Sequence, residues 1–153
     1  MKKLWITALL SALFISYALF VYAERREKVI NAEDIPQNVQ QFIASHFLNE
    51  EVSDARIVKY GFYKISFTDD YKALFDRQGK WLEITSDKNS MLPELIIALL
   101  PQPSQSYLAK HYQNYNIYSI EQNRQGYEVK IDGEKKMKIF FNHKGNLINE
   151  VID

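Results

Sequence analysis

The residues of this chain that could do chemistry are three histidines and two pairs of adjacent acids within residues 35–153. His46 and His111 fall at the predicted ends of two helices, and His143 falls in a predicted hairpin turn. A metal site needs further ligands beside an imidazole, and the chain has no cysteine to supply them. We therefore interpret all three histidines as structural or solvated residues and predict no metal site.

The acid pairs are Glu50–Glu51 and Asp69–Asp70, both in polar segments that connect predicted elements. A glycosidase needs two carboxyl groups set apart across a cleft, and adjacent residues do not provide that arrangement. A calcium loop needs oxygen donors that alternate over about 12 residues, which neither pair has. The sequence also lacks a glycine-rich phosphate loop and a Gly-x-Ser-x-Gly motif. We predict no catalytic residue, no cofactor and no enzymatic activity.

Aromatic and lysine side chains favour binding instead. In residues 62–67, Tyr63 and Ile65 share one side of a predicted strand, and Phe62 and Lys64 share the other. Exposed aromatic rings beside cations make a recognition surface for a protein or peptide. Two alternatives stay open, namely ordinary exposed apolar groups and a strand face assigned one residue out of step. The candidate partner-binding residues are Phe62, Lys64, Trp81, Lys130, Lys138 and Phe140.

The pattern of elements that would position these side chains occurs twice in the sequence. Two series of residues match in order at an offset of about 65 positions, which is typical of a duplicated supersecondary unit. The matched pairs include Ile35 and Leu100, Phe42 and Tyr107, His46 and His111, Phe75 and Phe141, and Gly79 and Gly145. A residue present in both copies is more readily explained by the fold than by a site.

Each copy predicts one helix followed by about four antiparallel strands. Apolar residues at Val39, Phe42, Ile43 and Phe47 have helical spacing, and short alternating runs follow them. The predicted strands span residues 55–60, 62–67, 71–75, 81–84, 116–122, 126–131, 135–141 and 147–151. A buried helical turn is expected over 91–99. The predicted fold class is α+β, with two tandem repeats that each pack a helix on a four-stranded antiparallel sheet. The other face of the sheet is expected to be open.

The first 23 residues are predicted to be a signal peptide. Lys2 and Lys3 precede an apolar run, and Val21-Tyr22-Ala23 forms a plausible cleavage signal. Because the apolar run is about 18 residues long, an uncleaved membrane anchor is the alternative. Residues 24–34 are predicted to be a linker, and residues 35–153 one domain with repeats over 35–85 and 91–153. Basic and acidic residues are equal in number, 19 each, which gives no electrostatic reason to expect nucleic acid.

The ordered motifs resemble those of the PepSY-like group, also described as β-lactamase-inhibitor-protein-like domains. The residues that carry the resemblance are Ile35–Pro36, His46–Phe47, Tyr63–Phe67 and Phe75–Trp81, with Leu100–Pro101, His111–Tyr112, Tyr127–Ile131 and Phe141–Gly145 in the second copy. The resemblance implies tandem helix-plus-four-strand modules, an exported location in Gram-negative bacteria, and binding rather than catalysis. It does not imply inhibition of a β-lactamase, because transferring a function along a fold is analogy.

The sequence thus predicts a periplasmic or secreted, non-catalytic module that binds another protein or a peptide of unknown identity. It would use the open face of its sheet. Two alternatives are a membrane-anchored accessory domain of an envelope system, which requires residues 1–23 to stay uncleaved, and an inhibitor of a periplasmic enzyme. A membrane is expected as a partner only in the first of these.

Overall fold

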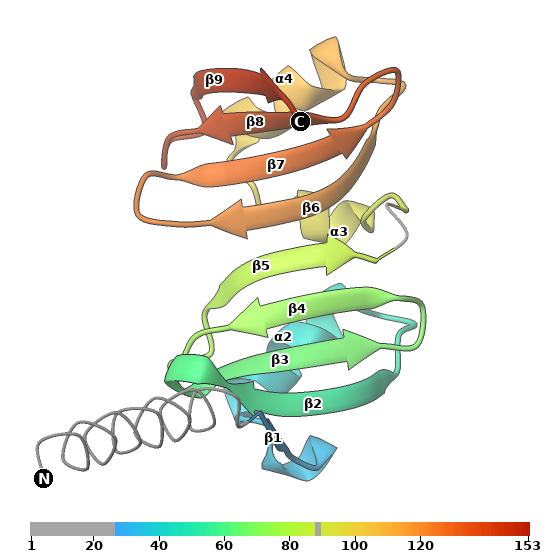
Figure 1. Cartoon of the computed structure of the whole chain (residues 1–153), viewed down its shortest axis with the longest axis vertical. Helices are drawn as coiled ribbons and strands as arrows, with labels where there is room; N and C mark the ends of the chain where they lie inside the picture. The colour runs from blue at the N-terminus through green and yellow to red at the C-terminus, as the bar shows by residue number, and fades with distance from the viewer. Residues whose placement is uncertain (1–26, 88–89) are drawn as a thin grey trace, which may run out of the picture.

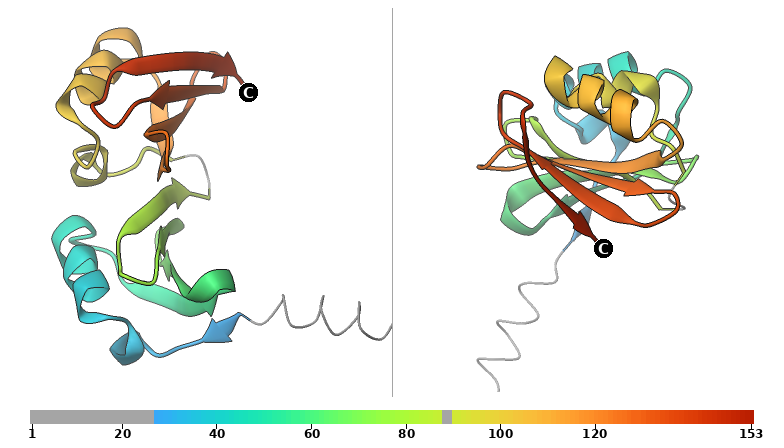
Figure 2. Two further views of the ribbon diagram at one scale, coloured as in Figure 1. Left: turned by 90° about the vertical axis from the view of Figure 1, so that its left-hand side faces the viewer. Right: turned by 90° about the horizontal axis from the view of Figure 1, so that it is seen from above.

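The computed structural model of the protein describes residues 27–87 and 90–153. These residues form one antiparallel sheet of nine strands that lie side by side in chain order, with helices on one face (Figures 1 and 2). The strands are β1 (Lys28–Val29), β2 (Val52–Val58), β3 (Phe62–Phe67), β4 (Tyr71–Phe75), β5 (Trp81–Ser86), β6 (Asn116–Gln122), β7 (Tyr127–Asp132), β8 (Met137–Phe141) and β9 (Leu147–Ile152). The α-helices are α2 (Gln37–His46), α3 (Glu94–Ile97) and α4 (Gln102–His111).

Each α-helix starts directly after a proline. Pro36, Pro93 and Pro101 have φ values between −53° and −57° with extended ψ, so each one turns the chain into the helix that follows. Proline suits this place because its fixed φ is helix-compatible and its missing N–H is not needed in the first turn. The helix and strand pattern predicted from the sequence is present, with most element ends within a few residues of the expected ones.

The core lies between the helices and the sheet face that they cover. Phe75 of β4 and Phe141 of β8 are its largest fully buried side chains. The ring of Phe42 on α2 meets the Phe75 ring edge-on with centroids 5.2 Å apart, and Tyr107 on α4 meets Phe141 in the same way at 5.8 Å. Edge-to-face contact at this separation is a favoured arrangement of aromatic rings. The helices are therefore held on the sheet by aromatic packing in both halves.

The two halves share a single sheet. Strand β5 pairs with β6 through Glu83–Glu121, Ile84–Ile120 and Thr85–Ser119, so the predicted α+β class is confirmed and the strands of both halves belong to one antiparallel sheet of nine strands. The physical reason is that two separate sheets would each leave a row of backbone N–H and C=O groups unpaired at the junction. The α3–α4 segment carries the chain from β5 to β6 over the helix-covered face (Figure 1).

Part of the segment expected to be a linker is ordered against the sheet. Lys28 and Val29 pair with Ile57 and Arg56 of β2, and Arg56 also forms a 3.0 Å ion pair with Glu27. A short 3-10 helix, η1 (Ala32–Asp34), then leads to α2. The signal peptide and its membrane-anchor alternative concern residues 1–23, which lie outside the described residues. Within residues 27–87 and 90–153, no helix has the length and apolar character needed to span a membrane.

Strand β2 ends earlier than the sequence predicts. The run expected to extend through Tyr60 stops at Val58, and a 3-10 turn, η2 (Lys59–Gly61), follows it. Tyr60 has a φ of 65° and Gly61 a φ of 73°, which reverse the chain direction into β3. The turn needs two consecutive residues with positive φ, and apolar patterning carries no information about that geometry.

Candidate open-face binding site

The candidate site is the sheet face opposite the helices. Figure 2 shows the helices on the same side of the sheet, and no described element covers the other side. Side chains alternate between the faces of a strand, so residues next to the buried Ile65, Val129 and Ile139 point to this open face. The alternation places five of the six predicted site residues there, and these are Phe62, Lys64, Lys130, Lys138 and Phe140.

Trp81 lies on the helix side instead. It pairs with the fully buried Phe75 across strands, packs against the core, and stacks on Tyr127 with ring centroids 6.3 Å apart. The register shifts between Leu74 and Phe75, so Leu82 is an extra residue on β5 and Trp81 no longer shares a face with Glu83. A bulge of this kind reverses the alternation, which corrects the face assignment made from the sequence.

The five open-face residues do not gather in one patch. Phe62 and Lys64 lie on β3, whereas Lys130 lies on β7 and Lys138 and Phe140 on β8. Five strand spacings separate β3 from β8, which is about 24 Å in a sheet with neighbours about 4.8 Å apart. The structure therefore divides the predicted residues into two groups, one in each half of the sheet.

A row of three glutamates lies between these groups. Glu83 of β5 is directly opposite Glu121 of β6, and Glu121 is directly opposite Glu128 of β7. Cross-strand partners have Cβ atoms about 4.5–5.5 Å apart, and like charges at such positions repel. The sequence analysis missed this row. Strand alternation could have placed each glutamate on the open face, but the β5–β6 pairing that aligns them is visible only in the tertiary structure.

Burial and the neighbouring carboxylates both disfavour the charged form of the central glutamate. Burial, followed by the negative charges of Glu128 and Glu83, raises the pKa of Glu121, and the cation of Lys130 acts in the opposite direction. The Lys130 ammonium lies 3.9 Å from Glu128, at the outer limit of an ion pair. The row is therefore only partly neutralised by the protein itself.

Two further lysines of the C-terminal half, Lys136 and Lys138, have partners of their own. Lys138 forms a 2.6 Å ion pair with Asp153, and that hydrogen bond raises the pKa of Lys138. The ammonium of Lys136 lies 6.0 Å from the centre of the Tyr118 ring. Lys130 and Lys138 are cross-strand neighbours, so their charges border the glutamate row along one side.

Phe140 lies at the edge of a hollow with mixed polar and apolar lining. A pocket of about 430 Å³ is lined by strands β7, β8 and β9 and the loop before β7. Phe140, Ile148 and Val151 supply apolar surface, and Glu128 belongs to both the hollow and the glutamate row. The open face thus places a partly unneutralised acidic row directly beside a hollow that is lined by both apolar and polar side chains. It could hold a basic group and an adjacent apolar side chain at the same time.

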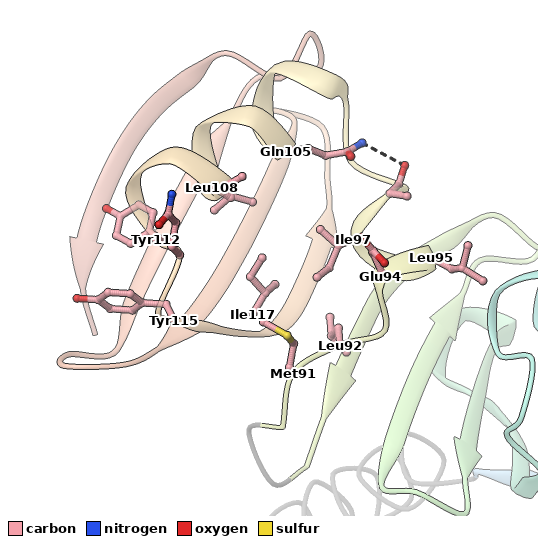
Figure 3. A pocket seen from close by; sticks show the side chains of 13 residues that line it. Met91, Leu92, Glu94, Leu95, Ile97, Gln105, Leu108, Tyr112, Tyr115 and Ile117 are labelled. Atoms are coloured by element: carbon pink, nitrogen blue, oxygen red, sulfur yellow. Dashed lines mark hydrogen bonds between the residues drawn. The ribbon is translucent and has the colours of Figure 1, made fainter.

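A second hollow lies on the helix side. Figure 3 shows Leu108 of α4, Tyr112 directly after that helix, Ile97 of α3 and Ile117 of β6 around a pocket of about 730 Å³. Gln105 crosses its upper end and donates to the carbonyls of Leu100 and Ala98. The pocket is mainly apolar, and Glu94 is the one charged residue among those that line it.

The histidines occupy three separate places. The Nδ1 atom of His46 lies 2.9 Å from the carbonyl of Phe42, whose ring it stacks on, and His111 stacks on Tyr107. The Nε2 atom of His143 lies 3.0 Å from the carbonyl of Arg124. Within residues 27–87 and 90–153, no three side chains of histidine or acid type are arranged to hold a metal ion.

Comparison with known proteins points to one family. The family described as "Putative beta-lactamase-inhibitor-like, PepSY-like" matches residues 61–149. A "putative calcium-regulated periplasmic protein" from Bacteroides thetaiotaomicron is 32% identical, with a TM-score of 0.70 over 82% of this chain and 96% of that one. A "putative periplasmic protein from DUF2874 family" from Bacteroides vulgatus is 29% identical, with a TM-score of 0.71 over 83% of this chain and 98% of that one. No curated protein is significantly similar to the chain.

Proposed function

This chain belongs to the PepSY-like, β-lactamase-inhibitor-like family, and on that premise we propose that it is a non-catalytic periplasmic binding module. Its partner would be a protein or peptide that lies across the open face of the sheet. The recognised feature would be a lysine or arginine side chain next to an apolar one. The periplasmic location rests on the two relatives named above, which are described as periplasmic proteins.

The observation that carries this proposal is the alignment of Glu83, Glu121 and Glu128 on three neighbouring strands. Direct opposition of like charges destabilises a sheet by a few tenths to about 1 kcal/mol for each pair. A cationic partner group would relieve that repulsion, because each carboxylate would then face a positive charge. Local features that cost stability without a structural return are concentrated at functional sites.

The neighbouring hollow supports the second half of the recognition. Phe140 and Val151 are cross-strand diagonal neighbours on the open face, and Glu128 links them to the acidic row. A buried apolar anchor contributes most of the energy at many interfaces, while charge complementarity contributes specificity and orientation. A partner that carries only the basic group is therefore expected to bind more weakly than one that carries both.

The experiment measures binding to an array of extended peptides in which arginine or lysine neighbours phenylalanine or leucine. A matched array replaces each basic residue with glutamate. We expect the Glu121→Gln/Glu128→Gln variant to lose at least tenfold in affinity for the basic array, and Phe140→Ala to lose a similar amount. Glu94→Gln is the control, because Glu94 is exposed on the helix side. Equal binding of both arrays, or equal loss in the control, would contradict the proposal.

Calcium enters this experiment as a competitor. One relative is described as calcium-regulated, and calcium prefers carboxylate oxygens. If millimolar CaCl₂ displaces the basic peptides while the same concentration of MgCl₂ does not, the glutamate row binds the cation directly. If neither salt acts beyond ordinary screening, the row is selective for an organic cation.

We also propose that the two halves of the domain are tandem copies. Support comes from the matching contacts Phe42–Phe75 and Tyr107–Phe141, which occupy equivalent helix and strand positions. Superposition of residues 90–153 on residues 27–87 should bring α4 onto α2 and β6–β9 onto β2–β5, and a different order of matched strands would refute it.

Export and the two alternative roles need their own tests. Sequencing the N-terminus of the protein recovered from cells separates a cleaved signal peptide, which would leave Glu24 first, from an uncleaved anchor. Inhibition of a periplasmic protease or β-lactamase is tested on a small enzyme panel. Its expected result under the binding-module proposal is no inhibition at micromolar concentration.

A further inference from the structure

The two outer edges of the sheet differ in how they are protected. At one edge, β1 is only two residues long and is flanked by the Glu27–Arg56 ion pair (Figure 1). At the other edge, β9 has six residues and pairs on one side only, with β8. Short edge strands and nearby charges are common devices that prevent a further strand from joining a sheet. Strand β9 lacks the first of them.

The side chains of β9 also do not prevent a further strand from pairing at this edge. Ile148, Val151 and Ile152 are 57%, 44% and 61% exposed, and the strand contains neither proline nor a basic residue. Its one charged residue, Glu150, accepts hydrogen bonds from the hydroxyls of Tyr107 and Tyr112 at 2.8 and 2.7 Å. The charge is therefore held against α4 instead of being presented to an approaching strand.

The C-terminal part of β9, after a bulge at Ile148, has backbone groups that are free to pair. The N–H of Asp153 donates to the carbonyl of Lys136 at 2.9 Å, which fixes the phase of the antiparallel ladder. Because the bonding direction alternates along a strand, Asn149 and Val151 bond toward β8, and the N–H and C=O of Glu150 and Ile152 point to the free edge. The register shift at Ile148 interrupts this alternation, so the phase applies only from Asn149 onward. A strand of matching length could pair with this edge.

We infer that β9 is an interface at which a second copy of this chain adds its own β9 in antiparallel orientation. A second copy is the favoured occupant because the same strand supplies both partners, and a two-fold axis makes the pairing self-complementary. The protected β1 edge disfavours the head-to-tail alternative, in which β9 would pair with β1 and produce an open filament. Two sheets would then join into one continuous sheet across the axis.

The register of the proposed β9–β9 pairing follows from the charge of Glu150 and from the alternating direction of the backbone hydrogen bonds. Centring the axis on Glu150 would set the two Glu150 residues opposite each other, which repulsion disfavours. Centring it on Val151 pairs Glu150 with Ile152 of the second copy and sets the two Val151 residues opposite each other. These valines would form a pair without mutual hydrogen bonds, whose Cα atoms lie about 4.5 Å apart. That separation is within the range that a disulfide can span.

The first experiment uses single-cysteine variants, because the natural chain has no cysteine. Val151→Cys, expressed from the full chain and oxidised with glutathione disulfide, should form a covalent dimer. Val29→Cys is the matched control, since Val29 is 63% exposed on the opposite edge strand. Equal crosslinking of the two variants, or a mixed product of the two in preference to the Val151→Cys dimer, would overturn the inference.

The second experiment needs no crosslink. Sedimentation of the unmodified protein should show monomer changing to dimer with rising concentration, as expected for a small interface of one strand pair. Val151→Lys should raise the dissociation constant at least tenfold, because lysine at a strand edge opposes pairing, and Val29→Lys should leave it unchanged. Thermal unfolding of both variants checks that each is folded. A protein that stays monomeric up to about 1 mM would overturn the inference.

Discussion

Glu83 of β5 lies directly opposite Glu121 of β6, at the strand pair that joins the two halves of the sheet. This pair is flanked on the same strands by the fully buried Ile84 and Ile120, which also face each other. Apolar contact thus holds the junction together on the helix side, while two carboxylates oppose it on the open side. The junction therefore combines a structural role with the electrostatic feature on which the proposed function depends.

The first prediction concerns the charge of Glu121. Glu121→Gln should stabilise the fold at pH 7 by a few tenths to about 1 kcal/mol, because it removes repulsion from both neighbouring strands. The raised pKa of Glu121 means that the folded state binds this proton more tightly than the unfolded chain does. Stability of the unmodified protein should therefore rise as pH falls from neutrality toward about 4.5, the ordinary pKa of a glutamate. Urea unfolding at several pH values measures both effects, and the advantage of Glu121→Gln should shrink on acidification.

The second prediction separates the two faces at adjacent positions of β8. Phe141 is 1% exposed and packs under Tyr107, so Phe141→Ala should cost about 3–5 kcal/mol of unfolding free energy. Phe140 lies on the open face, and both Phe140→Ala and Phe62→Ala should cost less than about 1 kcal/mol while weakening partner binding. Thermal unfolding and peptide binding are measured on the same preparations. A large loss of stability in Phe140→Ala would mean that its ring belongs to the core.

The third prediction concerns the tyrosine hydroxyls at Glu150. Burial and the hydrogen bond to Glu150 raise the pKa of Tyr112, and the same two causes raise the pKa of Tyr107. Tyr112→Phe should cost about 1–2 kcal/mol, as for loss of a hydrogen bond to a charged group. Because an unfolded tyrosine ionises near pH 10 and the folded one resists, stability should fall as pH rises above 10. That decline should be smaller in Tyr112→Phe, and the exposed Tyr60→Phe serves as the control.

The fourth prediction concerns the turn between β8 and β9. Gly145 has a φ of 83°, and a Cβ atom there would lie 2.7 Å from Cβ of Pro101 and 2.8 Å from Oγ of Ser104. The hydroxyl of Ser104 donates to the Gly145 carbonyl, so the turn is packed onto the start of α4. Gly145→Ala should therefore cost more than about 1 kcal/mol, through both positive φ and crowding. Lys144→Ala, at the exposed neighbouring position, should change stability by less than about 0.5 kcal/mol. Chemical unfolding of the two variants makes the comparison.

The glycine of this turn also illustrates what local sequence can predict. Gly79 and Gly145 were matched in the sequence as equivalent positions, and both have positive φ values, 79° and 83°, which glycine adopts without strain. Strands β3 and β4 match the predicted ranges at both ends, because alternation and turn residues are local signals. The open-face placement of Phe62, Lys64, Lys130, Lys138 and Phe140 follows from the same alternation. Their role in binding stays a prediction.

Other features required the folded chain. The bulge at Leu82 moved Trp81 to the core side, because one inserted residue reverses alternation without a distinctive sequence signal. Strands β5 and β6 pair although the whole α3–α4 segment separates them in the sequence. No local pattern could therefore align Glu83 with Glu121 and Glu128. The sequence by itself determined the elements and most side-chain faces, since these depend on neighbours in the chain. Only the tertiary structure decided which strands meet at the junction, the acidic row and the position of β9 at the edge of the sheet, because each depends on pairing between distant strands.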